Sequence, residues 1–189
     1  IVCVILLISL DMLRFASKWV PFEPKNLVYP DVGVTNKLKE IAGYDRAFAN
    51  FGAEGSVYYG LPVLEGYDAV YIRRFGQFIG SVDSKKLTDS ARSGVDLPLA
   101  SSNILPIANF LGVRYFVHKI TDGQKGWEFP FWEYSPESIK LIFDDGKYQV
   151  LENTKAYPRA FLVNKVIAEN NSQKILDNMF DPKTDLLRT

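Results

Sequence analysis

The stretch Ile104-Leu-Pro-Ile-Ala-Asn-Phe-Leu-Gly-Val-Arg-Tyr-Phe-Val-His118 decides the fold class of this chain. Pro106 suits a first helical turn, apolar residues follow it, and Gly112 is a typical end of a helix. From Val113 to His118 the apolar and polar positions then alternate as they do in a half-buried strand. A helix joined through one glycine to a strand predicts an α/β fold, with α+β as the open alternative.

A strand pair is expected downstream of this unit. Residues 139–143 and 147–152 flank Asp144-Asp145-Gly146, and glycine tolerates the positive φ that a tight hairpin turn needs. We interpret the two aspartates as turn formers and not as a catalytic pair. A further short strand is expected over 160–163, directly after Pro158.

The first half of the chain predicts short helices and a shaped loop. Thr35 can cap a helix that Gly43 ends, and a strand is expected over 46–51. Glycines and a proline within 54–66 predict a loop there. Asp68 is a suitable N-cap for a helix with one apolar face. That face contains four residues of the following stretch, Tyr71, Phe75, Phe78 and Ile79.

The chain begins with an uncharged apolar run, Ile1 to Leu10, which Met12 and Leu13 prolong past Asp11. A spanning helix needs about 20 apolar residues, so this run is interpreted as the end of a transmembrane helix in a chain that is a fragment. Arg14, Lys18 and Trp19 would then lie at the level of the lipid headgroups. The alternative is a buried helix or strand of a soluble domain.

Composition excludes several classes of function. Lys plus Arg and Asp plus Glu number 22 each in the 189 residues, which argues against nucleic acid as a partner. The single cysteine, Cys3, permits no intrachain disulfide and no cysteine-based metal site. With one histidine, His118, a zinc site would need carboxylates, and no metal or cofactor is expected. None of the common catalytic motifs is present, so no catalytic residue is assigned.

Four blocks of sequence, taken in order, resemble one family. They are Leu64-Glu-Gly-Tyr-Asp-x-x-Tyr71-x-x-Arg74, Leu111-Gly-Val-Arg-Tyr115, Glu152-Asn153 with Pro158-Arg159-Ala-Phe-Leu-Val163, and Phe180-Asp-Pro182. Together they resemble the extracytoplasmic C-terminal region of YfhO-like bacterial membrane proteins. Two departures are Ala69-Val70, where the family often has Pro-Leu, and Leu151, where it often has Tyr.

The resemblance implies a multi-pass protein of the bacterial cell membrane that is similar to GT-C-type glycosyltransferases. Such enzymes take sugar from a polyprenyl-phosphate carrier and modify cell-envelope polymers. Residues 1–18 would be the helix end that contacts the lipid bilayer. Residues 19–165 would form an extracytoplasmic α/β domain, and residues 166–189 a linker and the start of a β-rich domain. The catalytic carboxylate of such enzymes usually lies upstream of this region, so none is carried over.

On this interpretation the domain covers the active site or binds the acceptor, and its expected partners are a lipid-linked sugar or an envelope polymer. The residues expected to contact substrate are Tyr67, Asp68, Tyr71, Arg74 and Arg159. An arginine can hold a phosphate by paired hydrogen bonds, and tyrosines can stack on sugars. The alternative for all five is a buried polar network that shapes the glycine-rich loop. The alternative function is a non-enzymatic, membrane-tethered binding or scaffolding domain.

Overall fold

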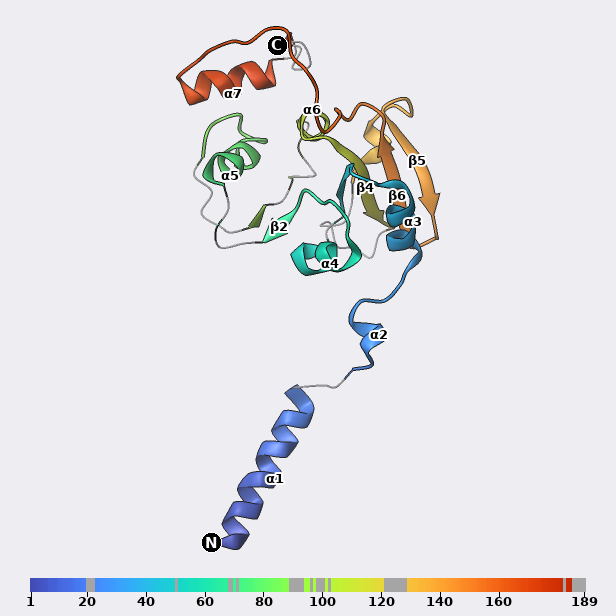
Figure 1. The fold of residues 1–189 in the computed structure, drawn as a ribbon, viewed down its shortest axis with the longest axis vertical. Helices are drawn as coiled ribbons and strands as arrows, with labels where there is room; N and C mark the ends of the chain where they lie inside the picture. Colours follow the sequence, from blue (N-terminus) through green and yellow to red (C-terminus); the bar gives the residue numbers. More distant parts are fainter. Residues whose placement is uncertain are drawn as a thin grey trace. The chain divides into compact units, whose positions relative to one another are not determined.

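The computed structural model describes most of the chain, in two compact units, Ile1–Asp31 and Val32–Thr189. The described residues are 1–19, 23–49, 51–67, 70, 72–88, 94–95, 97, 101, 103–120, 129–181 and 183–184. Within them the fold is mixed α/β, with 7 helices and a four-stranded mixed sheet (Figure 1).

The first unit contains two helices, α1 (Val2–Trp19) and α2 (Lys25–Val28). No side chain of α1 is buried. Its 18 residues include Asp11, Arg14 and Lys18, which interrupt the apolar sequence. Among the described helices, none has both the length and the apolar character that crossing a membrane requires.

The second unit is built on a sheet with strand order β1-β4-β6-β5. β1 runs parallel to β4, whereas β4 with β6 and β6 with β5 are antiparallel. The strands are β1 (Arg46–Phe48), β4 (Val113–Lys119), β5 (Ile139–Asp144) and β6 (Tyr148–Asn153). The expected α/β fold is therefore confirmed as a mixed α/β fold, and the expected hairpin is the β5–β6 pair.

β4 is buried on both faces, so the prediction of a half-buried strand was wrong. Phe116 packs in a cluster with Ile104 and Ile107 of α6 (Ile104–Phe110). On the opposite face, Val117 packs with Leu38 of α3 (Gly33–Ile41). β4 lies between β1 and β6, and helices cover both of its faces. Residues that point to either face, such as Phe116 and Val117, are therefore buried.

The link between α6 and β4 is fixed by a buried amide. The Asn153 side chain, fully buried at the end of β6, donates to Asn109 Oδ1 at 2.7 Å and to Val113 O at 2.9 Å. Gly112 joins the two elements with φ of +66°, and a Cβ there would lie 3.1 Å from Tyr157 O. The predicted role of Gly112 as the helix end is confirmed, and it has both a conformational and a packing reason.

Two expectations for the first half of the chain need correction. Residues expected to form a loop contain α4 (Gly52–Tyr59), because Gly60 follows the helix as its left-handed cap, with φ of +68°, and does not interrupt it. Thr35 lies in the first turn of α3 and not at its cap. Its hydroxyl donates to Val32 O at 2.9 Å, which places the helix start earlier than expected.

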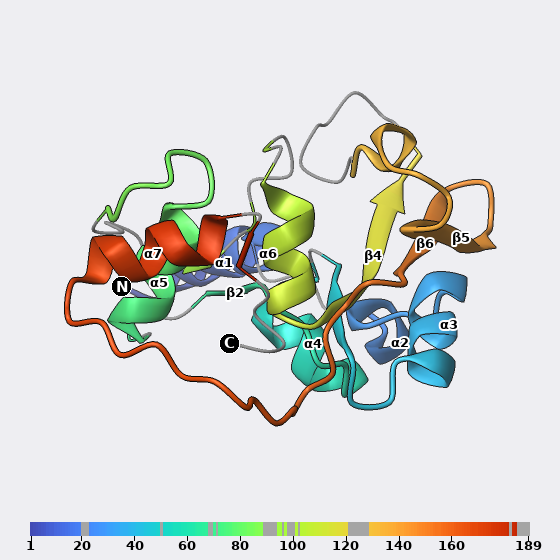
Figure 2. The same cartoon turned by 90° about the horizontal axis from the view of Figure 1, so that it is seen from above.

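The remaining helices lie together on one side of the sheet. They are α5 (Arg73–Gly80) and α7 (Ser172–Phe180), close to α6 (Figures 1 and 2). The apolar face predicted for α5 is confirmed for Phe75, Phe78 and Ile79, which pack in or against the core. The prediction of Asp68 as its N-cap was wrong, because α5 begins at Arg73 with Ile72 at the cap. Asp68 and Tyr71 themselves lie outside the described residues. Smaller elements are β2 (Gly66–Tyr67), paired with β3 (Gly94–Val95), and the turn η2 (Phe131–Glu133).

The strand expected over 160–163 was wrong. The described chain has no regular secondary structure there, with a bend at Ala160, and Leu162 is 98% exposed. The sequence has the β-propensity of a strand, yet no described edge of the sheet is available beside it. Further along, α7 occupies part of the 166–189 segment, and the boundary expected at 165/166 stays a prediction.

Candidate functional site

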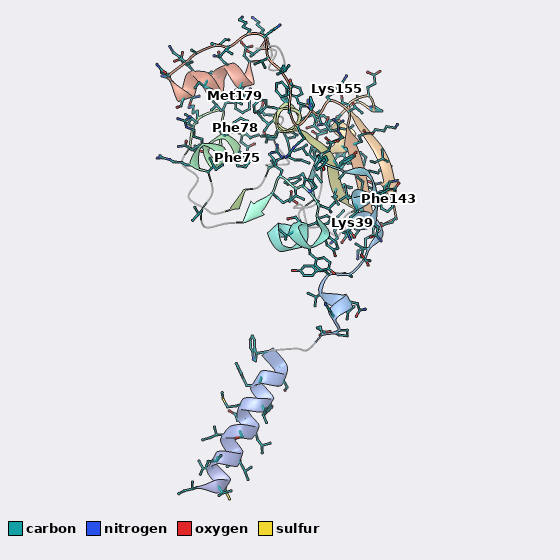
Figure 3. The ribbon with its side chains drawn as sticks, viewed as in Figure 1. Lys39, Phe75, Phe78, Phe143, Lys155 and Met179 are labelled. Atoms are coloured by element: carbon teal, nitrogen blue, oxygen red, sulfur yellow. The ribbon has the colours of Figure 1, made fainter. Side chains whose placement is uncertain are left out.

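A groove of about 570 Å³ lies between α5, α6 and α7. Its size is within the usual range of small-molecule sites. Figure 3 shows Phe75, Phe78 and Met179 in the space between α5 and α7. We call this the α5–α7 groove, and its lining consists of Arg74, Phe75, Gln77, Phe78, Leu87, Phe110, Leu111, Glu169, Asn170, Ser172, Ile175, Leu176 and Met179.

Aromatic rings form much of its floor because α5 places Phe75 and Phe78 on one face, three residues apart. The Phe78 ring contacts Phe110 of α6 edge-on, with ring centroids 6.0 Å apart. It also stacks against Phe180 of α7, at 6.5 Å. One aromatic side chain thus connects the three helices that form the groove.

α7 is held in place by polar contacts at its first turn. Asn171 caps the helix by accepting from the backbone N–H groups of Gln173 and Lys174 at 2.9 and 3.1 Å. The Gln173 amide then bridges to the segment after α5, accepting from Leu87 N at 3.0 Å and donating to Lys85 O at 2.9 Å. Gln173 therefore connects two walls of the groove that are distant in sequence.

Polar groups are found at the rim. Arg74 is exposed and forms no hydrogen bond or ion pair with any residue that the structure describes. Glu169, half-buried, accepts from Asn171 N at 2.8 Å. The side chains of Gln77, Asn170 and Ser172 add amide and hydroxyl groups. An apolar floor with one cation, one carboxylate and several neutral polar groups at the rim suits an amphipathic ligand whose anionic head pairs with Arg74.

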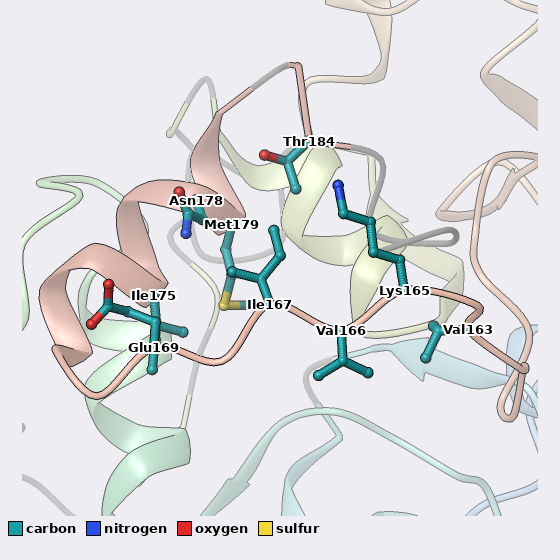
Figure 4. Close-up of a pocket in the computed structure, with 9 residues that line it drawn as sticks. All are labelled: Val163, Lys165, Val166, Ile167, Glu169, Ile175, Asn178, Met179 and Thr184. Atoms are coloured by element: carbon teal, nitrogen blue, oxygen red, sulfur yellow. The ribbon is translucent and has the colours of Figure 1, made fainter.

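A second, smaller pocket of about 270 Å³ lies beside α7 (Figure 4). It is formed between α7 and residues 163–169, and it shares Glu169, Ile175 and Met179 with the α5–α7 groove. Met179 and Ile175 therefore line both cavities.

The structure brings one of the five expected site residues to the groove. Arg74 lies at its rim. Tyr67 is described only by its backbone, in β2, and Asp68 and Tyr71 lie outside the described residues. Arg159 is not among the groove residues. The expected grouping of Tyr67, Asp68 and Tyr71 with Arg74 stays a prediction, because those three side chains are not described.

Arg159 lies near another arginine, at the start of β1. Arg46 is partly buried and donates to Leu111 O at 2.6 Å. Burial lowers the pKa of Arg46 first, and the positive charge of Arg159 lowers this pKa further. The adjacent Asp45 is engaged by Arg114, 2.6 Å away, so it does not offset this repulsion by a direct contact.

Other titratable groups have structural roles. His118 is buried, and its Nδ1 accepts from Phe129 N at 3.1 Å, so the neutral ring carries its proton on Nε2. Asp144 accepts from Gln149 at 2.7 Å and from Gly146 N at 2.8 Å, and these bonds lower its pKa. Asp145 accepts from the backbone of Lys147 and Tyr148. Within the described ranges, no three His, Cys, Asp or Glu side chains are grouped to hold a metal ion.

Glu65, in the first of the family-like blocks, holds a backbone turn. Its carboxylate accepts from the N–H groups of Ala49 and Phe51 at 3.0 and 3.3 Å, where the chain leaves β1 for α4. This carboxylate fixes the turn at the end of the strand. These hydrogen bonds give Glu65 a structural role in the fold.

No family model matches this chain, and neither a curated protein nor a solved structure is significantly similar to it. The resemblance of the four sequence blocks to YfhO-like proteins therefore stays a prediction. The account of function depends on the geometry of the α5–α7 groove.

Sequence reasoning missed most of the groove. Ile175, Leu176 and Met179 carry an amphipathic signal, and Phe75 and Phe78 another, but neither signal indicates that the two faces meet. Phe110 and Gln173 were not singled out. For Gln173, the signal available was its place after Asn171, at the first turn of a helix, where a side chain can reach a neighbouring segment.

Proposed function

We propose that this chain is the extracytoplasmic part of a multi-pass bacterial membrane protein, and that its α5–α7 groove binds a lipid-linked sugar phosphate. In this proposal the parent protein is a lipid-carrier-dependent glycosyltransferase that modifies envelope polymers. The domain covers the active site and holds the carrier near the membrane surface. The observation that carries the proposal is the exposed Arg74 at the rim of an apolar groove.

The chemistry of the groove favours the lipid-linked sugar over the envelope polymer. The phenylalanines and Met179 offer apolar area for prenyl groups, and Arg74 offers paired hydrogen bonds to phosphate. Polymers such as teichoic acids are polyanions and would need several cations in a row. Among the described residues that line the groove, Arg74 and Glu169 are the charged ones, so a single phosphate can pair with Arg74 whereas the further phosphates of a polymer find no second cation and meet the negative charge of Glu169.

The apolar face of α1 supports a membrane contact for residues 1–18. Large apolar side chains along the helix, among them Leu6, Leu7 and Leu13, are more than half exposed. Contact with lipid would remove this apolar area from water. We propose that this helix contacts the lipid bilayer.

Calorimetric titration with farnesyl phosphate, with farnesol as the uncharged comparison, tests the groove. Arg74→Ala is expected to weaken binding of farnesyl phosphate by about 10- to 100-fold, because a hydrogen bond to a charged group contributes about 1.5–3 kcal/mol. Farnesol binding should change little. Arg73→Ala is the matched control, since Arg73 is adjacent and exposed but does not line the groove.

Equal effects of the two substitutions would contradict the role of Arg74. Tighter binding of glycerol phosphate oligomers than of farnesyl phosphate would favour the polymer as ligand. Sugar transfer by the parent protein, assayed with and without this domain, separates an enzyme from the alternative, a membrane-tethered binding domain. A parent that binds carrier but transfers no sugar would support the alternative.

A further inference from the structure

The smaller pocket beside α7 and the α5–α7 groove share part of their walls. Glu169, Ile175 and Met179 line both cavities. At about 270 Å³, the smaller pocket lies below the range of about 300–1,000 Å³ that small-molecule sites usually have. Its size and its shared wall suit an extension of the groove better than a separate site.

The two cavities follow one another around the surface of α7. An α-helix turns by about 100° per residue, so Ile175 and Met179 lie on one stripe of the helix. Leu176 lies to one side of this stripe and lines the groove. Asn178 lies to the other side and lines the smaller pocket. A chain molecule that crosses the stripe would therefore pass from the groove into the smaller pocket.

Apolar side chains make up much of the wall of the smaller pocket. Figure 4 shows the side chain of Ile167 extending toward α7. Ile167 is 53% exposed and Ile175 is 43% exposed, so apolar area in this pocket is open to water. A hydrocarbon chain that covers this area would remove it from water, which is favourable. The apolar residues that line the pocket are Val163, Val166, Ile167, Ile175 and Met179.

The charged residues of the smaller pocket favour an uncharged occupant. Glu169 lies at the wall shared with the groove, where its carboxylate accepts from Asn171 N at 2.8 Å. Its negative charge repels an anionic group that passes it, but not an uncharged chain. Lys165 is exposed, and its apolar stem can lie against a chain while its ammonium group stays in water.

We propose that the smaller pocket holds the far end of the apolar chain of the ligand whose phosphate pairs with Arg74. The chain begins in the groove, crosses Ile175 and Met179, and ends against Ile167 in the smaller pocket. The site thereby selects ligands by chain length and favours long prenyl chains over short ones. This inference rests on the proposed function, because it extends the ligand assigned to the groove.

Calorimetric titration with geranyl, farnesyl and geranylgeranyl phosphate, each below the concentration at which it forms micelles, tests the inference. The chain should bind geranylgeranyl phosphate about tenfold more tightly than farnesyl phosphate, because a further isoprene unit leaves water. Ile167→Asp should remove this gain, because it puts a carboxylate into the smaller pocket. Leu162→Asp is the matched control, since it adds the same charge to the same segment at a 98% exposed position that lines neither cavity.

A gain of apolar area tests the same inference from the opposite direction. Asn178→Leu should raise the ratio of the geranylgeranyl to the geranyl phosphate affinity by about threefold, because Asn178 lines only the smaller of the two cavities. Lys174→Leu, at an exposed position of α7 that lines neither cavity, should leave this ratio unchanged. The ratio cancels the effect that a lost positive charge has on all three phosphates.

The outcomes separate this inference from the proposed function. Binding that depends on Arg74, with a chain-length gain that Ile167→Asp leaves intact or that Leu162→Asp removes equally, would overturn the inference and leave the groove as the site. A tenfold loss for all three phosphates in Lys165→Ala would put the phosphate in the smaller pocket and would also overturn it. If none of the three phosphates binds, the proposed function fails, and this inference fails with it.

Discussion

Two stretches close together in the chain, 139–153 and 159–168, have similar apolar character, but only the first forms paired strands. The first forms the β5–β6 hairpin, with Leu141 opposite Leu151 and a turn held by Asp144 and Asp145. The second has no regular secondary structure, is bent at Arg159, Ala160 and Asn164, and is unpaired within the described residues. The difference shows that β-propensity produces a strand only where a partner edge is present. Both faces of the sheet are packed against the core, whereas two cavities border α7. We call the region around α7 the open side of the domain.

The largest expected effect comes from making one substitution in both stretches. Leu151→Ala should lower the free energy of unfolding by about 2–5 kcal/mol, because Leu151 is fully buried and its loss leaves a cavity. Leu162→Ala should change it by less than about 0.5 kcal/mol, because the side chain is exposed. Urea denaturation measures both. Comparable losses would mean that the 159–168 segment is packed and not open.

The hairpin could be predicted from sequence because its turn residues act locally. Asp144-Asp145-Gly146 determines the turn whatever lies around it, and Gly112 likewise determines the end of α6. The burial of β4 on both faces could not be predicted from its alternation, since that depends on α3 and α6 covering the sheet.

The same limit applies to the candidate site. Arg74 and the Phe75–Phe78 stripe were visible in sequence, because both lie on one helix. Their meeting with α7 depends on Gln173 reaching Leu87 and Lys85, a contact between segments 86 and 88 residues apart. The helix at 52–59 was missed because its glycines suggested a loop, although Gly60 caps the helix.

A second comparison uses two asparagines. Asn153→Ala should lower the free energy of unfolding by about 2 kcal/mol, because it leaves the carbonyl of Val113 and the amide of Asn109 without their buried donor. Asn164→Ala, on the exposed segment, should have almost no effect. Thermal and urea unfolding measure the two. A small effect of Asn153→Ala would show that water replaces the lost hydrogen bonds.

A third comparison separates α7 from the sheet. Gln173→Ala should cost about 1 kcal/mol, because it removes the bonds between α7 and the segment after α5. Hydrogen exchange should accelerate in α7 and stay unchanged in β4 and β6. Lys174→Ala, at the next and exposed position, serves as the control. Equal acceleration throughout the domain would mean that α7 and the sheet unfold as one unit.

The smallest expected effect concerns pH and belongs to the sheet side. Burial raises the pKa of Tyr115, and the charges of Glu152 and Asp45 raise this pKa further. The folded state therefore holds the tyrosine proton more tightly than the unfolded state, whose tyrosine pKa is about 10. The stability that this group contributes is present below about pH 10 and is lost as the pH rises through the folded pKa.

Urea denaturation at pH 8 and at pH 10.5 should show this loss. The loss should be smaller in Tyr115→Phe, although that variant also lacks the hydrogen bond from Tyr115 to Ile41 O. Tyr134, whose pKa burial also raises, accounts for part of what remains. An identical loss in the variant would contradict the assignment to Tyr115.

The most direct test of the account is a nuclear magnetic resonance titration of the chain with farnesyl phosphate. The groove predicts the largest chemical-shift changes in α5, α6 and α7, at residues such as Phe75, Phe110 and Met179, and almost none in β5 and β6. The Arg74→Ala protein should need about 10- to 100-fold more ligand for the same changes. Changes centred on the sheet, or none at millimolar ligand, would contradict the claim that the open side around α7 is the binding side.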